Sequence, residues 1–454
     1  MKLTKTLLLT VGVLAAGSFA PCAHGDVTLT TLVSFGGTNG ANPYAGMLRG
    51  EDGNFYGTTA AGGTNGYGTI FQMTPAGALT VMASFNRTNG ANPTAGLAQG
   101  VDGKFYGTTY SGGTMGYGTV FNMTTNGTLT SLVSFAGTNG VYPKAGLVEA
   151  NDGNYYGTTA LGGTNYVGTI FKMTTNGTLT TLVSFDPQGG SPYAGLVQGV
   201  DGSLYGTTYG SSTAFKMTTN GTFLTLYSFT GGDDGGNPYA ELVQGADGNL
   251  YGTTFFGGTN GYGTAYKLTT NGAFTALVSF GGTNGAYPQG RLAQASDGSL
   301  YGTTEGGGAY TNPSDYGYGT AFKLTTNGTL TTLFSFSGTN GVNQQGGLVQ
   351  GADGNLYGTT VDGGASGKGT IFRLNITVPP PPSFLMVEET GATLTLTWSA
   401  TVGQNYQMLY KTNLNQINWD NLGPTNIATN ASMTTLDATG PDQQRFYRIE
   451  LLLP

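Results

Sequence analysis

The sequence is poor in the two residue types that most often carry nucleophilic and acid–base chemistry. Its 454 residues include one cysteine and one histidine, Cys22 and His24. Both lie in residues 1–25, which are interpreted below as a signal peptide. Removal of that segment leaves no thiol or imidazole, which excludes Ser–His–Asp and Cys–His catalysis and zinc sites built on these ligands. We therefore expect no catalytic residues of these kinds, no metal centre and no disulfide bonds.

Charge is also scarce, and acid outweighs base. Charged residues make up 9% of the chain, with 23 acidic and 16 basic side chains and a net charge of −7. Nucleic-acid binding depends on clustered lysine and arginine, so the composition argues against a nucleic-acid partner. Regularly spaced Tyr, Phe, Val and Leu predict an ordered all-β chain. The 81 glycines then serve its turns.

The N-terminal residues 1–25 have the pattern of a secretory signal peptide. Lys2 and Lys5 precede an apolar run, and small residues follow at Ala23 and Gly25. The pattern predicts a secreted protein, extracellular or at the outer cell surface, with no membrane span once the signal is removed. Two alternatives are a retained membrane anchor and a lipid on Cys22. The shortness of the apolar run and the residues before Cys22 favour neither.

A Tyr-Gly-Thr-Thr motif recurs seven times, and an Asp-Gly turn precedes each copy. In the unit from Ala95, "AGLAQG", "KFYGTT", "TVFNMT" and "TLTSLVSF" are the expected strands. Asp-Gly and Asn-Gly pairs between them predict tight hairpins. A period near ~50 residues is typical of a four-stranded propeller blade. The copies begin at Tyr56, Tyr106, Tyr156, Tyr205, Tyr251, Tyr301 and Tyr357.

The two ends of the repeat region complement each other. A fourth-strand motif, Leu29–Phe35, precedes the first unit, and the last unit stops after its third strand at Gly369–Leu374. Pairing these segments leaves no free sheet edge. The sequence therefore predicts a seven-bladed β-propeller over residues 26–376, closed by an N-terminal outer strand.

The repeat itself resembles a known family. The recurrent "DGNLYGTT…GG…GYGTIFKMTTNGTLTTLVSF", from Leu29 to Leu374, is similar to the GloVer tandem repeat of exported proteins in Gloeobacter and Verrucomicrobia. The resemblance implies export and surface display. It brings no known catalytic residue.

A second module is expected after the repeats. Residues 377–383 contain four consecutive prolines, which favour an extended spacer. Residues 384–454 then alternate apolar and polar side chains, as in "TLTLTWSA", and resemble a small fibronectin-type-III-like β-sandwich. Trp398 and Trp419 both lie here, and we expect them in its core; exposed platforms for sugars are the alternative.

Any functional site is expected on the face that carries the long loops. The Asp-Gly and Asn-Gly hairpins are short and uniform, whereas the other connections are long, and loops on a rigid scaffold carry function. Tyrosines before the first strands, and departures from the repeat that combine carboxylates with aromatic rings, suit sugars or, less well, calcium. The candidate residues are Tyr44, Tyr193, Tyr239, Asp233, Asp234, Phe255, Phe256, Glu305, Asp315 and Asp362.

Three functions fit these observations. The favoured one is a non-catalytic exported monomer that binds an extracellular glycan or surface protein and needs no cofactor. The second is a polysaccharide hydrolase or lyase that uses carboxylates. The third is a purely structural envelope component. Seven similar units favour the first and third, because an active site requires blades to diverge locally.

Overall fold

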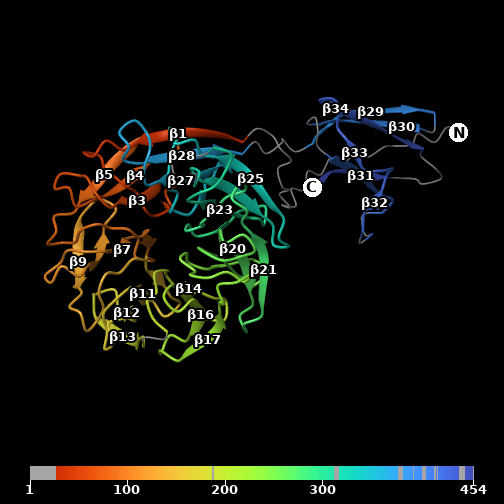
Figure 1. Ribbon diagram of the computed structural model, residues 1–454. Coiled ribbons are helices and arrows are strands. Elements are labelled where there is room, and N and C mark those ends of the chain that lie inside the picture. The colour runs from red at the N-terminus through yellow and green to blue at the C-terminus, as the bar shows by residue number, and fades with distance from the viewer. Residues whose placement is uncertain are drawn as a thin grey trace. The chain divides into compact units, whose positions relative to one another are not determined.

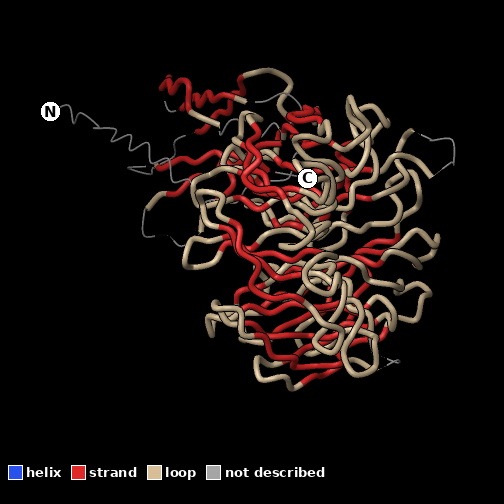
Figure 2. The backbone as a smooth tube through the Cα atoms, turned by 90° about the vertical axis from the view of Figure 1, so that its left-hand side faces the viewer, coloured by secondary structure: helices blue, strands red, loops and turns tan. Residues whose placement is uncertain are grey.

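In the computed structural model the chain divides into two compact units, Thr28–Asn375 and a second unit of Ile376–Pro454 with Met1–Val27. The structure describes residues 27–186, 189–310, 316–376, 382–391, 393–400, 405–413, 416, 418–438 and 445–452. The expected signal peptide, Asp315 and linker residues 377–381 lie outside these ranges. The described residues form strands and loops without a helix (Figure 2).

The unit Thr28–Asn375 contains seven four-stranded antiparallel sheets, numbered here in chain order. The first strands are β2 (Leu48–Arg49), β6 (Ala98–Gln99), β10 (Val148–Glu149), β14 (Val197–Gln198), β18 (Val243–Gln244), β22 (Ala293–Gln294) and β26 (Val349–Gln350). The second strands are β3 (Phe55–Thr59), β7 (Phe105–Thr109), β11 (Tyr155–Thr159), β15 (Leu204–Thr208), β19 (Leu250–Thr254), β23 (Leu300–Thr304) and β27 (Leu356–Thr360).

The third strands are β4 (Thr69–Met73), β8 (Thr119–Met123), β12 (Thr169–Met173), β16 (Thr213–Met217), β20 (Thr264–Leu268), β24 (Thr320–Leu324) and β28 (Thr370–Asn375). The fourth strands are β5 (Leu79–Ser84), β9 (Leu129–Ser134), β13 (Leu179–Ser184), β17 (Phe223–Ser228), β21 (Phe274–Ser279), β25 (Leu330–Ser335) and, in sheet 7, β1 (Thr28–Ser34). The β1 strand pairs antiparallel with β28, with Leu29 opposite Leu374. Figure 1 shows the sheets around a common centre, with β1 beside β28.

Sheet 7 contacts sheet 1 through the same bonds that join the other neighbours. The Asn92 N–H of the loop that enters sheet 2 donates to the Tyr67 carbonyl of sheet 1 at 2.9 Å, and the Asn42 N–H of the loop that enters sheet 1 donates to the Lys368 carbonyl of sheet 7 at 2.8 Å. Thr58 Oγ1 donates to the Ala95 carbonyl at 2.9 Å, and Thr359 Oγ1 donates to the Ala45 carbonyl at 2.9 Å. The junction between the last and first sheets therefore repeats the internal pattern.

The core lies between sheets and is built by the Tyr-Gly-Thr-Thr strands. Phe105 packs on Tyr56 with ring centroids 4.2 Å apart, and Phe55 packs on Tyr357 at the same distance. The motif tyrosine is buried, yet its hydroxyl donates to the aspartate of its own hairpin, as Tyr56 does to Asp52 Oδ2 at 2.9 Å. The Asp-Gly aspartates thus satisfy buried hydroxyls.

The first strand is shorter than predicted: two residues, Ala98–Gln99, instead of the six of "AGLAQG". The preceding Ala95 carbonyl accepts the Thr58 hydroxyl of the neighbouring sheet, and Ala95 has no partner in the ladder with β7. The residue before the proline is also left-handed, as at Asn92 with φ of 53°. This turn directs the chain toward the centre of the unit before the strand begins.

The second unit, described by itself, has two small sheets. One contains β29 (Phe384–Thr390), β30 (Thr393–Ser399) and β34 (Ser432–Ala438); in the other, β31 (Asn405–Lys411) pairs with β32 (Asp420–Asn421), β33 (Asn426–Ile427) and β35 (Phe446–Leu452). Trp398 is 1% exposed in the core between them. The expectation for Trp419 was wrong: it precedes the short strand β32, is half-buried, and Lys411 Nζ lies 4.9 Å from its ring.

Candidate functional site

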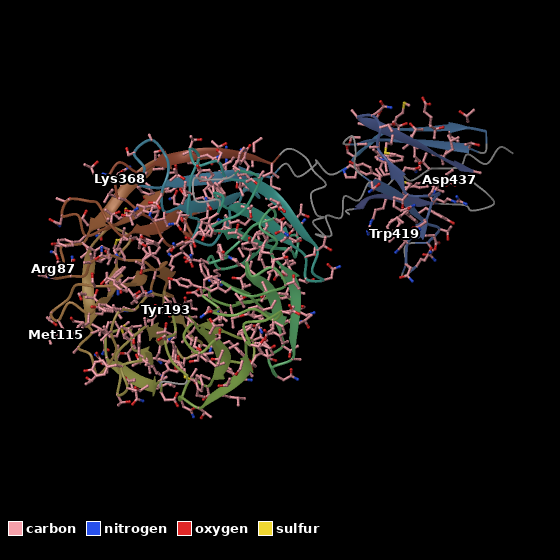
Figure 3. All side chains as sticks on the ribbon, viewed as in Figure 1. Arg87, Met115, Tyr193, Lys368, Trp419 and Asp437 are labelled. Carbon is pink, nitrogen blue, oxygen red and sulfur yellow. The ribbon has the colours of Figure 1, made fainter. Side chains whose placement is uncertain are left out.

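The unit Thr28–Asn375 has a central cavity of about 1310 Å³. It is lined by the segments that run into the first strand of each of the seven sheets. Tyr193, on its wall, is labelled toward the middle of the ring of sheets in Figure 3, whereas Arg87 and Met115 are labelled at its edge. The repeats therefore bring seven equivalent segments, far apart in sequence, around one space.

Two sets of equivalent positions vary at the long-loop end of this cavity, and we call them the mouth. The first set follows the proline, or Gln344 in sheet 7: Tyr44, Thr94, Lys144, Tyr193, Tyr239, Gln289 and Gln345. The second set follows Tyr-Gly-Thr-Thr: Ala60, Tyr110, Ala160, Tyr209, Phe255, Glu305 and Val361. The residues on both sides of the first set and the threonine before the second set are nearly uniform, whereas the residues after the second set also vary, so the chemical variety lies at the mouth and just beyond it.

The two sets contact each other through aromatic rings. Tyr193 and Tyr209 stack with centroids 4.8 Å apart and an interplanar angle of 3°. Tyr239 meets both rings edge-on, at 5.6 Å and 5.8 Å, and Phe255 lies 6.4 Å from Tyr239. Burial, with smaller effects from neighbouring groups, raises the pKa of Tyr239 to about 12. This phenol is therefore neutral and able to donate a hydrogen bond at ordinary pH.

Lys144 lies on the free side of the stacked pair. Its Nζ is 3.7 Å from the centroid of Tyr193, a cation–π contact at short range. Tyr193 is consequently covered by Lys144 on one side and by Tyr209 on the other. Tyr44 differs, because it lines the cavity and none of the ring contacts of the described residues includes it. Tyr44 is therefore the tyrosine of the first set whose ring is not packed on another ring.

A carboxyl group completes the mouth on the side of sheet 6. Gln289 Nε2 donates to Glu305 Oε2, which joins the first set to the second. Burial raises the pKa of the half-buried Glu305, and the hydrogen bond from Gln289 opposes that rise. Glu305 is thus a partly desolvated acceptor beside an amide.

Deeper in the cavity, one position is glycine in five sheets and charged in two. Glu241 and Arg291 occupy it in sheets 5 and 6, and Arg291 Nη1 lies 3.5 Å from Glu241 Oε2. Beside them the repeated hydroxyl-to-carbonyl bond fails: Thr207 and Thr253 are buried without a hydrogen-bond partner. We did not predict this pair from the sequence, although aligning the seven repeats shows a charged residue in two of them where the other five have glycine.

The structure distributes the other candidate residues as follows. Phe255, which belongs to the mouth, packs on Phe256 with ring centroids 4.5 Å apart. Asp234 caps its own loop, accepting from the Thr230 N–H at 2.9 Å and from Tyr227 at 3.0 Å, while Asp233 is exposed. Asp362 accepts from the side chains of Asn42 and Asn343.

Asp234, Glu305 and Asp362 are therefore engaged separately, each by neutral donors. Within the described ranges, no group of three Asp, Glu, His or Cys side chains is placed to hold a metal ion. Those ranges also contain no helix long and apolar enough to cross a membrane.

Four-stranded antiparallel sheets around a cavity lined by repeated loops define a β-propeller-like repeat protein. Solved structures with this fold include two lyases. A streptogramin B lyase is 18% identical, with 77% of this chain and 97% of that chain covered and a TM-score of 0.56. A catalytically inactive histidine-to-alanine variant of virginiamycin B lyase from Staphylococcus aureus, with quinupristin, is 16% identical over 77% and 99%, with a TM-score of 0.57.

The sequence also matches a family of repeat proteins. The model of the Gloeobacter/Verrucomicrobia repeat matches residues 15–212 and 208–413. The chain belongs to this repeat family. No curated protein matches the sequence.

Proposed function

We propose that this is an exported, non-catalytic protein whose seven sheets are the blades of a ring closed by β1, and that the ring binds an extracellular carbohydrate at the mouth. Sheets 7 and 1 are joined by the same hydrogen bonds that join the other neighbouring sheets, which supports closure of the ring. The signal-like residues 1–25 support export.

The observation that carries carbohydrate binding is the composition of the mouth. Tyr44 offers an aromatic ring, Tyr239 a neutral hydroxyl and Gln289 an amide on one cavity wall, and Glu305 accepts a hydrogen bond from Gln289 behind that wall. Sugars combine apolar ring faces with hydroxyl groups, and aromatic rings with polar neighbours match both. Small-molecule sites in general combine an apolar wall with a few convergent polar groups.

Lyase chemistry of the kind in the structural neighbours is less well supported. Replacement of one histidine makes the virginiamycin B lyase variant catalytically inactive. Here the single histidine is His24, within the expected signal peptide. A carboxylate-based hydrolase stays the alternative, with Glu305 as the desolvated acid.

The test is binding of the purified protein to a glycan array, followed by titration calorimetry with the best ligand. Tyr44→Ala should weaken binding about tenfold, or ~1.4 kcal/mol. Tyr166→Ala is the matched control, since Tyr166 is 70% exposed and is absent from the cavity wall. Equal affinity of Tyr44→Ala and the wild type would refute the site. Release of reducing sugar would favour the hydrolase.

A further inference from the structure

We infer that the carbohydrate recognised at the mouth is anionic, and that Lys144 binds its carboxylate or sulfate group. The inference rests on the proposed function and names the class of its ligand. It starts from an unusual feature of Lys144: a half-buried ammonium group in a cavity, held by an aromatic ring instead of an acid.

The lysines that accompany the buried motif tyrosines are satisfied differently. Lys172 Nζ lies 2.8 Å from Asp152 Oδ2, and Lys216 Nζ lies 2.8 Å from Asp201 Oδ2. Among the described residues, the ion pairs include no partner for Lys144. Burial lowers its pKa, and no charged neighbour offsets the change. A desolvated cation without a counter-charge is costly, so a ligand that supplies the counter-charge recovers that cost.

The position of the ammonium group suits an incoming ligand. Tyr193 is clamped between Lys144 and the parallel ring of Tyr209, so the lysine has a fixed support at 3.7 Å. A preorganised donor loses less conformational freedom when it binds. Of the other charged residues on the cavity wall, Glu241 is paired with Arg291, and Arg49 and Glu51 belong to the first strand of sheet 1 and the hairpin after it.

The tyrosine rings near Lys144 indicate which class of anionic ligand fits this cavity. Tyr44, Tyr110 and Tyr239 line the same cavity as Lys144. A saccharide that carries acid groups places apolar ring faces and anions at sugar-residue spacing, and this wall offers both kinds of partner. An acidic peptide would use Lys144 and leave the ring faces without a match, so we favour the saccharide.

The experiment compares four probes of matched length: an oligogalacturonate, a sulfated galactan oligosaccharide, a neutral galactan oligosaccharide and an oligoglutamate peptide. Each is titrated into the wild type, Lys144→Gln, Lys144→Arg and the control Lys172→Gln. We expect an anionic saccharide to bind the wild type about tenfold more tightly than the neutral one. Lys144→Gln should lose that difference, Lys144→Arg should retain most of it, and Lys172→Gln should retain it all.

The two saccharide arms identify the acid group, carboxylate or sulfate, and preference for either supports the inference. Equal binding of neutral and anionic saccharides refutes it and leaves the proposed function intact. Binding of oligoglutamate without either saccharide refutes it in favour of a protein partner. Absence of binding to all four probes refutes both. Circular dichroism and melting of each variant separate loss of affinity from loss of fold.

Discussion

Closure of the ring can be tested at Phe55, which sheet 7 covers. Phe55 is 1% exposed and its ring lies 4.2 Å from that of Tyr357, more than 300 residues away in the sequence. Phe105 is the matched residue inside the array: it is also 1% exposed and lies 4.2 Å from Tyr56. Both belong to an identical Phe-Tyr-Gly-Thr-Thr strand. Only a closed ring buries both equally.

The expected cost follows from the burial of one aromatic side chain. A buried ring removes roughly 150–200 Å² of apolar surface from water. At about 25 cal/mol per Å² this amounts to ~4–5 kcal/mol, within the ~3–5 kcal/mol measured for Phe→Ala in cores. We expect Phe55→Ala and Phe105→Ala to lower the free energy of unfolding by this amount and to agree within ~1 kcal/mol.

The assay is chemical denaturation of the secreted form, followed by tyrosine fluorescence and far-UV circular dichroism. In an open array Phe55 would lie on the uncovered face of the first sheet. Phe55→Ala would then cost less than ~1 kcal/mol, while Phe105→Ala would still cost several. That inequality would refute the closed ring.

Three further predictions follow from the repeat. The side chains of Gln99 and Gln350 each accept a hydrogen bond from a backbone N–H in the hairpin of the preceding sheet, but the equivalent Arg49 cannot accept one. Arg49→Gln should therefore add ~0.5–1.5 kcal/mol to the free energy of unfolding, measured by chemical denaturation. An unchanged free energy would contradict the prediction that this hydrogen bond is missing in the wild type. A Cβ at Gly107 would lie 2.6 Å from Phe121 Cζ, so Gly107→Ala should lower the free energy of unfolding by ~1–3 kcal/mol. Gly103 has a positive φ and open space around it, so Gly103→Ser is the control that measures backbone strain without a steric clash. Burial raises the pKa of Asp152 and Asp201, but hydrogen bonds from Lys172 or Lys216 and from a tyrosine outweigh it and lower the pKa to about 2. The stabilisation that these two carboxylates contribute is present above their ordinary pKa of 3.8 and is lost as pH falls toward about 2. Between these pH values, the melting temperature of the Asp152→Asn, Asp201→Asn double variant should therefore fall less steeply than that of the wild type. Parallel curves of melting temperature against pH would contradict this prediction.

The repeat made the sheets predictable from sequence. Asp-Gly and Asn-Gly turns separate segments of fixed length, and the motif tyrosine recurs because every sheet buries it against the next. The length of the first strand was not predictable in the same way. The Ala95 carbonyl accepts Thr58 from another sheet, a contact between residues 37 positions apart that no local pattern announces.

The candidate site was predictable at the level of the face and less so at the level of residues. Tyr44, Tyr193 and Tyr239 do line the cavity. Both faces of the Tyr193 ring are covered, one by Lys144 and one by Tyr209. These three residues lie on three separate loops, so the arrangement could not be predicted from the sequence. Asp234 occupies the position of Asn39, whose Oδ1 caps the Gly36 N–H, so its divergence from the repeat is a substitution of one cap by another.

Several departures at the mouth occur as contacting pairs, an arrangement that the proposed binding site would require. Independent drift at fourteen equivalent positions would scatter unusual residues without regard to their neighbours. Instead Tyr209 of sheet 4 lies parallel to Tyr193 of the loop that enters it, with Lys144 of the preceding loop on the opposite face. Gln289 likewise contacts Glu305, and deeper in the cavity, outside the mouth, Glu241 pairs with Arg291. Sheets 1 and 7 have Ala60 and Val361 in the second set. The proposed binding site accounts for matched polar and aromatic partners on its wall, and loss of ligand affinity without loss of stability in Tyr44→Ala would separate it from a purely structural ring.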